Sequence, residues 1–300
     1  MSQKKDVERK RGNRLGFWFF RTAVRIFGLR GTYGLLYIVS LYYLAFDHAA
    51  VAASKAYVRR RFPDHGVLRQ MFDVYLLFVS QGKSLIDRYF VAAGGNEIGL
   101  ELVGYEKIKD LLADGKKGII LLTAHVGNWQ VAMTSLGKLD RDVYLMMRTE
   151  DNVAVKEALN IDSEKETVRI IYTDGAMGGV IEALKAINRG DIVSIMGDRT
   201  YGYASIEVSL LGGKVRFPYG AFSLASAARC PVAVLLSAKI GVTKHVVDFS
   251  HVINPPANRQ GNKEEEIHAC VQEFAGVLEE YAVRYPYQWF VFRDMWQGND

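Results

Sequence analysis

The stretch GIILLTAHVGNWQVA, residues 118–132, joins an apolar run to a group of polar side chains. It opens with an apolar run, 118–123, whose length and composition are typical of a buried strand. Polar side chains follow at once: His125, Asn128 and Gln130. A helix is predicted from residue 128 onward, so the stretch has the form of a βα unit. It therefore predicts an α/β fold with polar groups just beyond the end of a strand.

The same alternation continues along the chain. Short apolar runs predict strands at 118–123, 142–147, 167–172, 191–196 and 231–238, and helical patterns lie at 128–137, 151–161, 177–189 and 218–229. Residues 206–217, with Gly212-Gly213 in the middle, predict a hairpin, and 262–284 a long last helix. Strands alternating with helices imply a mixed, mainly parallel sheet flanked by helices. We expect this α/β unit to span residues 96–300.

Residues 1–95 predict a separate segment of basic, aromatic helices. From Lys4 to Arg30 there are nine cationic and two acidic side chains, a balance of +7 against +5 for the whole chain. Residues 15–28 are apolar on one side, with Arg21 and Arg25 on the other, as in helices that lie on anionic membranes. Residues 31–46 carry no charge but fall short of the roughly 20 residues that a full span needs. Shallow insertion, an assisted span and a core helix all remain open.

Composition and motifs exclude several functions. Outside the N-terminal segment the charges nearly balance, which disfavours a nucleic-acid binder. The sequence contains no GxSxG, GxxxxGK[ST] or GxGxxG motif, so it shows no hydrolase elbow and no nucleotide-phosphate loop. Its six histidines have no metal-ligand spacing, and we expect no metal and no cofactor.

Three reactive side chains follow three predicted strands. His125, Arg148 and Asp198 each come directly after an apolar run. Ligands of open α/β sheets bind outside the carboxyl ends of the strands. We therefore expect an imidazole, a guanidinium and a carboxylate to share one edge of the sheet.

Several stretches of the chain resemble the lysophospholipid acyltransferase superfamily. HVGNWQ, 125–130, is similar to its signature, a histidine followed five positions later by Asp or Glu. YLMMR (144–148), MGDRT (196–200), VRFPYGAFSLA (215–225) and YPYQWF (285–290) resemble the bacterial lipid A late acyltransferases, the lauroyl and myristoyl type. The resemblance covers nearly the whole chain, most clearly residues 98–296.

The resemblance implies an acyltransferase that moves a fatty acyl group from acyl carrier protein or acyl-CoA to a membrane lipid or glycolipid. His125 would be the general base, a role that suits imidazole near neutral pH. Arg148 and Asp198 would hold substrate or support the site, and Arg199, Arg216 and Phe217 would contact substrate. Asn128 would help to stabilise an oxyanion, or would simply cap a helix. The implied location is the cytoplasmic face of the bacterial inner membrane.

Position 130 departs from the family pattern. Gln130 can accept a hydrogen bond but carries no charge, so it cannot stabilise an imidazolium as a carboxylate does. Three alternatives follow: a slow enzyme, an enzyme that uses another carboxylate such as Asp198, and a catalytically impaired lipid-binding or scaffolding homologue.

The acidic surface of a carrier protein would suit a basic docking patch. The sequence offers three of these: Arg59 to Arg61, Lys116-Lys117 and Lys214 to Arg216.

Overall fold

The computed structural model describes residues 14–92, 95, 98–148, 168–174, 176–200, 202–256 and 262–296. Eight strands within these ranges form one mixed sheet in the order β1-β9-β8-β2-β5-β3-β4, with β10 paired to β8. The strands are β1 (Gly99–Val103), β2 (Ile119–Thr123), β3 (Val143–Met147), β4 (Val168–Tyr172), β5 (Ile192–Met196), β8 (Val232–Lys239), β9 (Lys244–Asp248) and β10 (Val252–Ile253). Among the described strands of this sheet, β8–β9 and β8–β10 pair antiparallel and the other pairings are parallel. The predicted α/β fold with a mainly parallel sheet is confirmed.

Strand β2 lies inside the sheet, between β8 and β5. All five of its residues are buried. Successive side chains of a strand point to opposite faces. Accordingly Ile120 and Leu122 belong to one hydrophobic core, and Ile119 and Leu121 to the other. Helices cover both faces of the sheet, which explains why this strand is apolar throughout.

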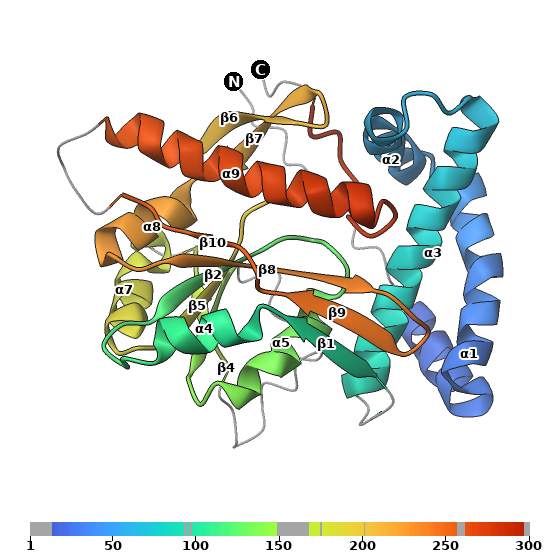
Figure 1. Ribbon diagram of the computed structural model, residues 1–300. Coiled ribbons are helices and arrows are strands. Elements are labelled where there is room, and N and C mark those ends of the chain that lie inside the picture. The colour runs from blue at the N-terminus through green and yellow to red at the C-terminus, as the bar shows by residue number, and fades with distance from the viewer. Residues whose placement is uncertain are drawn as a thin grey trace.

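The helices form two layers around the sheet (Figure 1). One face is covered by α7 (Val180–Asn188), α8 (Gly220–Ala228) and α9 (Lys263–Arg284), and the other by α4 (Tyr105–Leu112), α5 (Trp129–Met133) and the 3-10 helix η1 (Thr134–Lys138). A second 3-10 helix, η3 (Ala176–Gly179), precedes α7. A separate two-stranded sheet, β6 (Ser205–Leu210) with β7 (Gly213–Pro218), packs beside α9 (Figure 1).

Three helices, α1 (Arg14–Phe46), α2 (His48–Arg61) and α3 (Val67–Ala92), stand together at one end of the sheet (Figure 1). Helix α1 is kinked at Gly28, whose φ of 64° lies in the left-handed region. Its Leu29, Tyr33 and Leu36 pack against Ile86 on α3. In the described part of the chain no single helix is long and apolar enough to cross a membrane. Residues 22–46 and 48–61 meet that test only as a pair bent by 96°.

The predicted strands, the hairpin and the last helix are confirmed, each within about two residues of its predicted ends. The helix predicted over 128–137 is α-helical only to Met133 and continues as η1. The helix predicted over 177–189 begins at Val180, after η3. The helix predicted over 151–161 lies outside the described residues. Strands β1, β9 and β10 and helix α4 were not predicted.

Candidate active site

His125 and Asp198 meet at the carboxyl ends of two neighbouring strands. His125 follows β2 and Asp198 follows β5, and these strands are parallel and paired. The backbone N–H of Gly197 donates to the carbonyl of Thr123, which extends the pairing to the site. The Asp198 Oδ1 atom lies 2.8 Å from Nδ1 of the His125 ring. The expected convergence of imidazole and carboxylate at one edge of the sheet is thus observed.

The Asp198 carboxylate is held by three donors. Its Oδ2 atom accepts hydrogen bonds from the backbone N–H of His125, at 3.0 Å, and from Nε1 of Trp289, at 3.1 Å. Only 1% of the Asp198 surface is exposed. Burial by itself would raise the pKa of this carboxyl. The His125 ring with its hydrogen bonds and the Arg199 guanidinium outweigh burial, however, and hold the pKa well below its usual value.

An ionised carboxylate can only accept hydrogen bonds, so the His125 Nδ1 atom must carry the proton between them. In the neutral ring this leaves Nε2 as the basic nitrogen. The His125 side chain is 21% exposed, whereas Asp198 is almost fully enclosed. The buried carboxylate therefore fixes the orientation of the His125 ring through Nδ1.

The segment that follows α9, with Trp289 and Phe290, packs against this pair. Its Trp289 is fully buried, pairs with Val126 through an isolated β-bridge and meets the Tyr57 ring edge-on. The Phe290 backbone N–H donates to the carbonyl of His125, and its carbonyl accepts from Arg199 Nη2 at 3.0 Å. Trp289 was not among the predicted site residues. The sequence signal for this role was the tryptophan in the 285–290 stretch, because the N–H of a buried indole needs a hydrogen-bond acceptor.

The Gln130 side chain binds an arginine and leaves the His125 ring to Asp198. Its Oε1 atom accepts a hydrogen bond of 2.9 Å from Nη1 of Arg88, on α3. Gln130 is buried. The carboxylate that contacts the imidazole thus comes from position 198, and the side chain at 130 ties α5 to α3.

Asn128 caps α5. Its Oδ1 atom accepts from the backbone N–H of Val131, and its Nδ2 atom donates to the carbonyl of Ser84. Its own backbone N–H donates to Ser237 Oγ at 2.9 Å. The structure shows Asn128 as a helix cap, and its role toward an oxyanion stays a prediction.

The other predicted site residues are more dispersed. Arg148 follows β3 at the same edge of the sheet, and its Nε atom lies 3.8 Å from an oxygen of Asp174. Arg216 lies on β7 and binds the side chain and carbonyl of Ser205. Phe217 is fully buried against Phe274. Neither Arg216 nor Phe217 joins the hydrogen bonds around Asp198. Within the described ranges, no group of three His, Cys, Asp or Glu side chains is placed to hold a metal.

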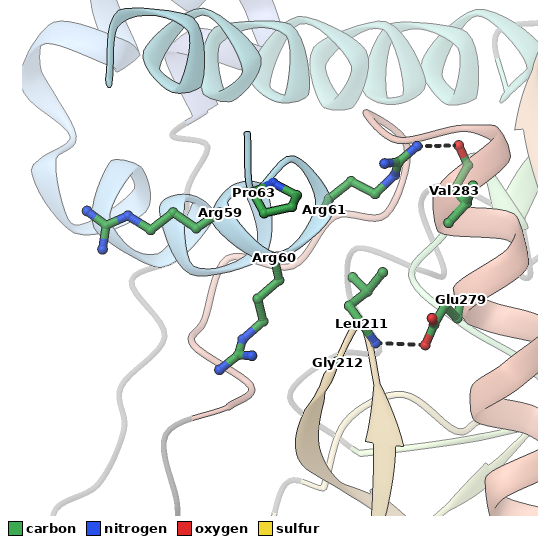
Figure 2. Close-up of a pocket in the computed structure, with 8 residues that line it drawn as sticks. All are labelled: Arg59, Arg60, Arg61, Pro63, Leu211, Gly212, Glu279 and Val283. Atoms are coloured by element: carbon green, nitrogen blue, oxygen red, sulfur yellow. Dashed lines mark hydrogen bonds between the residues drawn. The ribbon is translucent and has the colours of Figure 1, made fainter. Parts of the chain in front are cut away.

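A groove of about 570 Å³ lies between the end of α2, the β6–β7 turn and α9. Figure 2 shows its Arg59, Arg60 and Arg61 pointing in three different directions. Arg61 donates to the carbonyls of Ala282 and Val283, and Arg60 lies 5.0 Å from the centre of the Trp296 ring. Two of the three cations therefore hold α2 against α9 and Trp296. The groove is not lined by His125 or Asp198.

The family of the chain is shown by its sequence. A family model described as "Bacterial lipid A biosynthesis acyltransferase" matches residues 82–298. The match covers more than half of the chain, so the chain belongs to this family of acyltransferases. It includes every stretch that carried the resemblance, from 125–130 to 285–290. A search of curated proteins finds no match.

Proposed function

We propose that this chain moves a fatty acyl group from a thioester, acyl carrier protein or acyl-CoA, to a membrane lipid or glycolipid. His125 is the general base in this proposal. The observation that carries it is the 2.8 Å contact between Asp198 Oδ1 and His125 Nδ1 at the end of β2. Family membership supports acyl transfer in lipid A biosynthesis.

The His125 ring takes up one proton during the reaction and later returns it. Nε2 takes the proton of the acceptor hydroxyl or amine as that atom attacks the thioester carbonyl. The new C–O or C–N bond forms, the C–S bond breaks, and the leaving thiolate takes the proton from the imidazolium. The ionised Asp198 stabilises the imidazolium during this cycle, and the Trp289 and backbone donors keep the carboxylate in place. Arg148, at the same edge, is the residue we assign to holding substrate.

The alternative is a lipid-binding homologue with impaired catalysis. It is favoured by Gln130, which stands where the resemblance implies an Asp or Glu and which accepts a hydrogen bond from Arg88. Against it stands Asp198, which supplies the buried negative charge beside the imidazole. The second of the three sequence-based alternatives, a carboxylate from elsewhere, is therefore our choice.

The test is thiol release from an acyl-carrier-protein thioester in the presence of bacterial membrane lipid. We expect turnover by the purified chain, a loss of about 10³-fold in His125→Ala and a loss of about 10²- to 10⁴-fold in Asp198→Asn. His251→Ala, which changes an exposed histidine, is the matched control and should behave as the unaltered chain. Turnover that survives His125→Ala would remove the proposal. Co-purified lipid without turnover, even in Gln130→Glu, would establish the alternative.

We also propose that the chain works at the cytoplasmic face of the bacterial inner membrane, held there by α1. The side chains of Ile38, Leu41, Tyr42 and Phe46 are all exposed and recur at helical spacing along one side of α1. Tyr33 and Leu36 face α3 from the opposite side. An exposed apolar stripe of this kind is typical of a helix that lies in a lipid surface.

A further inference from the structure

A second pocket, of about 290 Å³, lies where α1, α3 and the β8–β9 hairpin meet. It is lined by Tyr33 of α1, Ser80 and Lys83 of α3, Lys239 and Val242 of the hairpin, and Gln288. Figure 1 shows the end of the β8–β9 hairpin reaching the side of α3. Neither His125 nor Asp198 lines this pocket, so it is distinct from the candidate active site.

Two ammonium groups flank one phenol ring in this pocket. Lys239 Nζ lies 5.1 Å and Lys83 Nζ lies 5.7 Å from the centre of the Tyr33 ring. Burial lowers the pKa of Lys239, and the positive charge of Lys83 lowers it further, against the opposing effect of Asp87. Both cations therefore belong to one electrostatic site.

Asp87 is the carboxylate that binds Lys239, and its two oxygens are already engaged. Its Oδ2 atom lies 2.6 Å from Lys239 Nζ and 2.9 Å from His245 Nε2, and its Oδ1 atom accepts from the Tyr33 hydroxyl. Lys83 donates instead to the Tyr37 hydroxyl, at 2.9 Å. Among the described residues no carboxylate pairs with Lys83, so one positive charge of the pocket remains uncompensated.

Two apolar side chains are exposed at the hairpin end, and one of them, Val242, lines the pocket. Ile240 and Val242, at the hairpin end, are 41% and 43% exposed. Exposed apolar side chains beside a cationic pocket match an amphiphile whose anionic group enters the pocket while its apolar part stays at the rim. Helix α1, which supplies Tyr33 to the pocket, carries the exposed apolar stripe on its other side.

The pocket is also joined to the loop that carries His125. The Gln288 side chain forms two hydrogen bonds with the backbone of Lys239. Its Oε1 atom accepts from the Lys239 N–H at 2.7 Å, and its Nε2 atom donates to the Lys239 carbonyl at 2.9 Å. The carbonyl of the same Gln288 accepts the Gly127 N–H at 2.7 Å. One residue thus contacts both the lysine pocket and the segment between His125 and the start of α5.

We propose that this pocket binds the phosphate of an anionic lipid headgroup, with Lys83 and Lys239 as the cations that hold it. A bound phosphate supplies the anionic partner that Lys83 does not find among the residues the structure describes. The inference rests on the proposed function in one respect: it places a lipid phosphate beside the loop of the acyl-transfer site.

The test measures protection of the two lysines in the full chain in detergent. Dihexanoyl phosphatidic acid, a short-chain lipid with a phosphomonoester, is added, and acetylation of each lysine is followed by mass spectrometry. We expect Lys83 and Lys239 to react several-fold more slowly, and the exposed Lys109 to react at an unchanged rate. Equal protection by inorganic phosphate alone would overturn the assignment to a lipid, and absence of protection would overturn the site.

A binding measurement with charge-matched variants completes the test. Vesicles of phosphatidylcholine with phosphatidic acid should bind Lys83→Gln about fivefold more weakly than the unaltered chain, as expected for one lost cation at a lipid surface. Arg59→Gln, which removes an exposed charge from α2, should bind nearly as well as the unaltered chain. Equal losses in both variants would mean unspecific attraction and would overturn the proposal. The same protection is expected in His125→Ala, so failure here and failure of acyl transfer can be told apart.

Discussion

At the scale of the residue, the ionisation of Asp198 links the site to stability. Its pKa is lowered in the folded chain, whereas an aspartate in the unfolded chain titrates near 3.9. Above that value Asp198 is ionised in both states and its stabilising contribution is complete. As the pH falls below about 4, the unfolded state takes up a proton that the folded state does not, and the contribution is progressively lost.

We therefore expect the free energy of unfolding to fall more steeply below about pH 4 in the unaltered chain than in Asp198→Asn. The difference in slope should reach at most about 1.4 kcal/mol per pH unit. Urea unfolding in detergent at a series of pH values measures it. Asp114→Asn, at an exposed turn, is the control and should keep the slope of the unaltered chain. Parallel curves for the unaltered chain and Asp198→Asn would contradict an ionised Asp198.

Sequence reasoning identified His125 and Asp198 because both follow strands, and parallel strands bring their carboxyl ends to one edge. It left open which acceptor faces the imidazole, since that depends on side-chain directions that spacing does not determine. Gln130 is the second residue of α5, beyond the turn at Gly127, and its oxygen accepts a hydrogen bond from Arg88 of α3. The role of Trp289 was equally hidden, because a buried indole and an indole that binds a carboxylate look the same in a sequence.

At the scale of the element, the turn between β2 and α5 depends on one glycine. Gly127 has a φ of 59°, and a Cβ atom built there would lie 2.0 Å from the carbonyl oxygen of Ser237. Both the backbone conformation and the space therefore require glycine. The turn sets the direction in which the chain leaves His125 for the helix cap at Asn128.

We expect Gly127→Ala to lower the free energy of unfolding by on the order of 3 kcal/mol, because it combines left-handed strain with a backbone clash. Gly137→Ala is the matched control: a Cβ atom there meets nothing within 4 Å, and the change should be close to neutral. Urea unfolding of both variants measures the difference. Similar stability of the two would show that the turn can rearrange.

The elements that the sequence predicted well are those buried on both faces, such as β2 and β8. Their continuous apolar runs directly predict strands that are buried on both faces. Strand β1 was missed since it lies at the edge of the sheet, where its residues are alternately exposed and half-buried. Strands β9 and β10 were missed because β9 begins with a lysine and a histidine, and β10 has only two residues. Short strands with polar residues or with alternating exposure carry too little apolar pattern to stand out.

For the whole molecule, helices α1 and α3 matter because they connect the exposed apolar side of α1 to the sheet. The sequence predicted their helical, aromatic character but left a core role open. One carboxylate connects these helices to the sheet. Asp87 of α3 binds Tyr33 of α1, Lys239 of β8 and His245 of β9. Such a contact between elements distant in sequence has no local signature, so no spacing rule would have found it.

The outward face of α1 gives the last prediction. Ile38 and Leu41 are 70% and 58% exposed, and transferring two such side chains from water to lipid contributes on the order of 3 kcal/mol. The double change Ile38→Asn and Leu41→Asn should therefore weaken binding to vesicles at least about tenfold in a flotation assay. Its stability in detergent should be unchanged, because neither side chain belongs to the core. Ile181→Asn with Val283→Asn, at two exposed apolar positions on α7 and α9, is the matched control and should bind vesicles normally. If both doubles bound alike, α1 would not be the membrane contact, and its exposed stripe would instead require a protein partner to cover it.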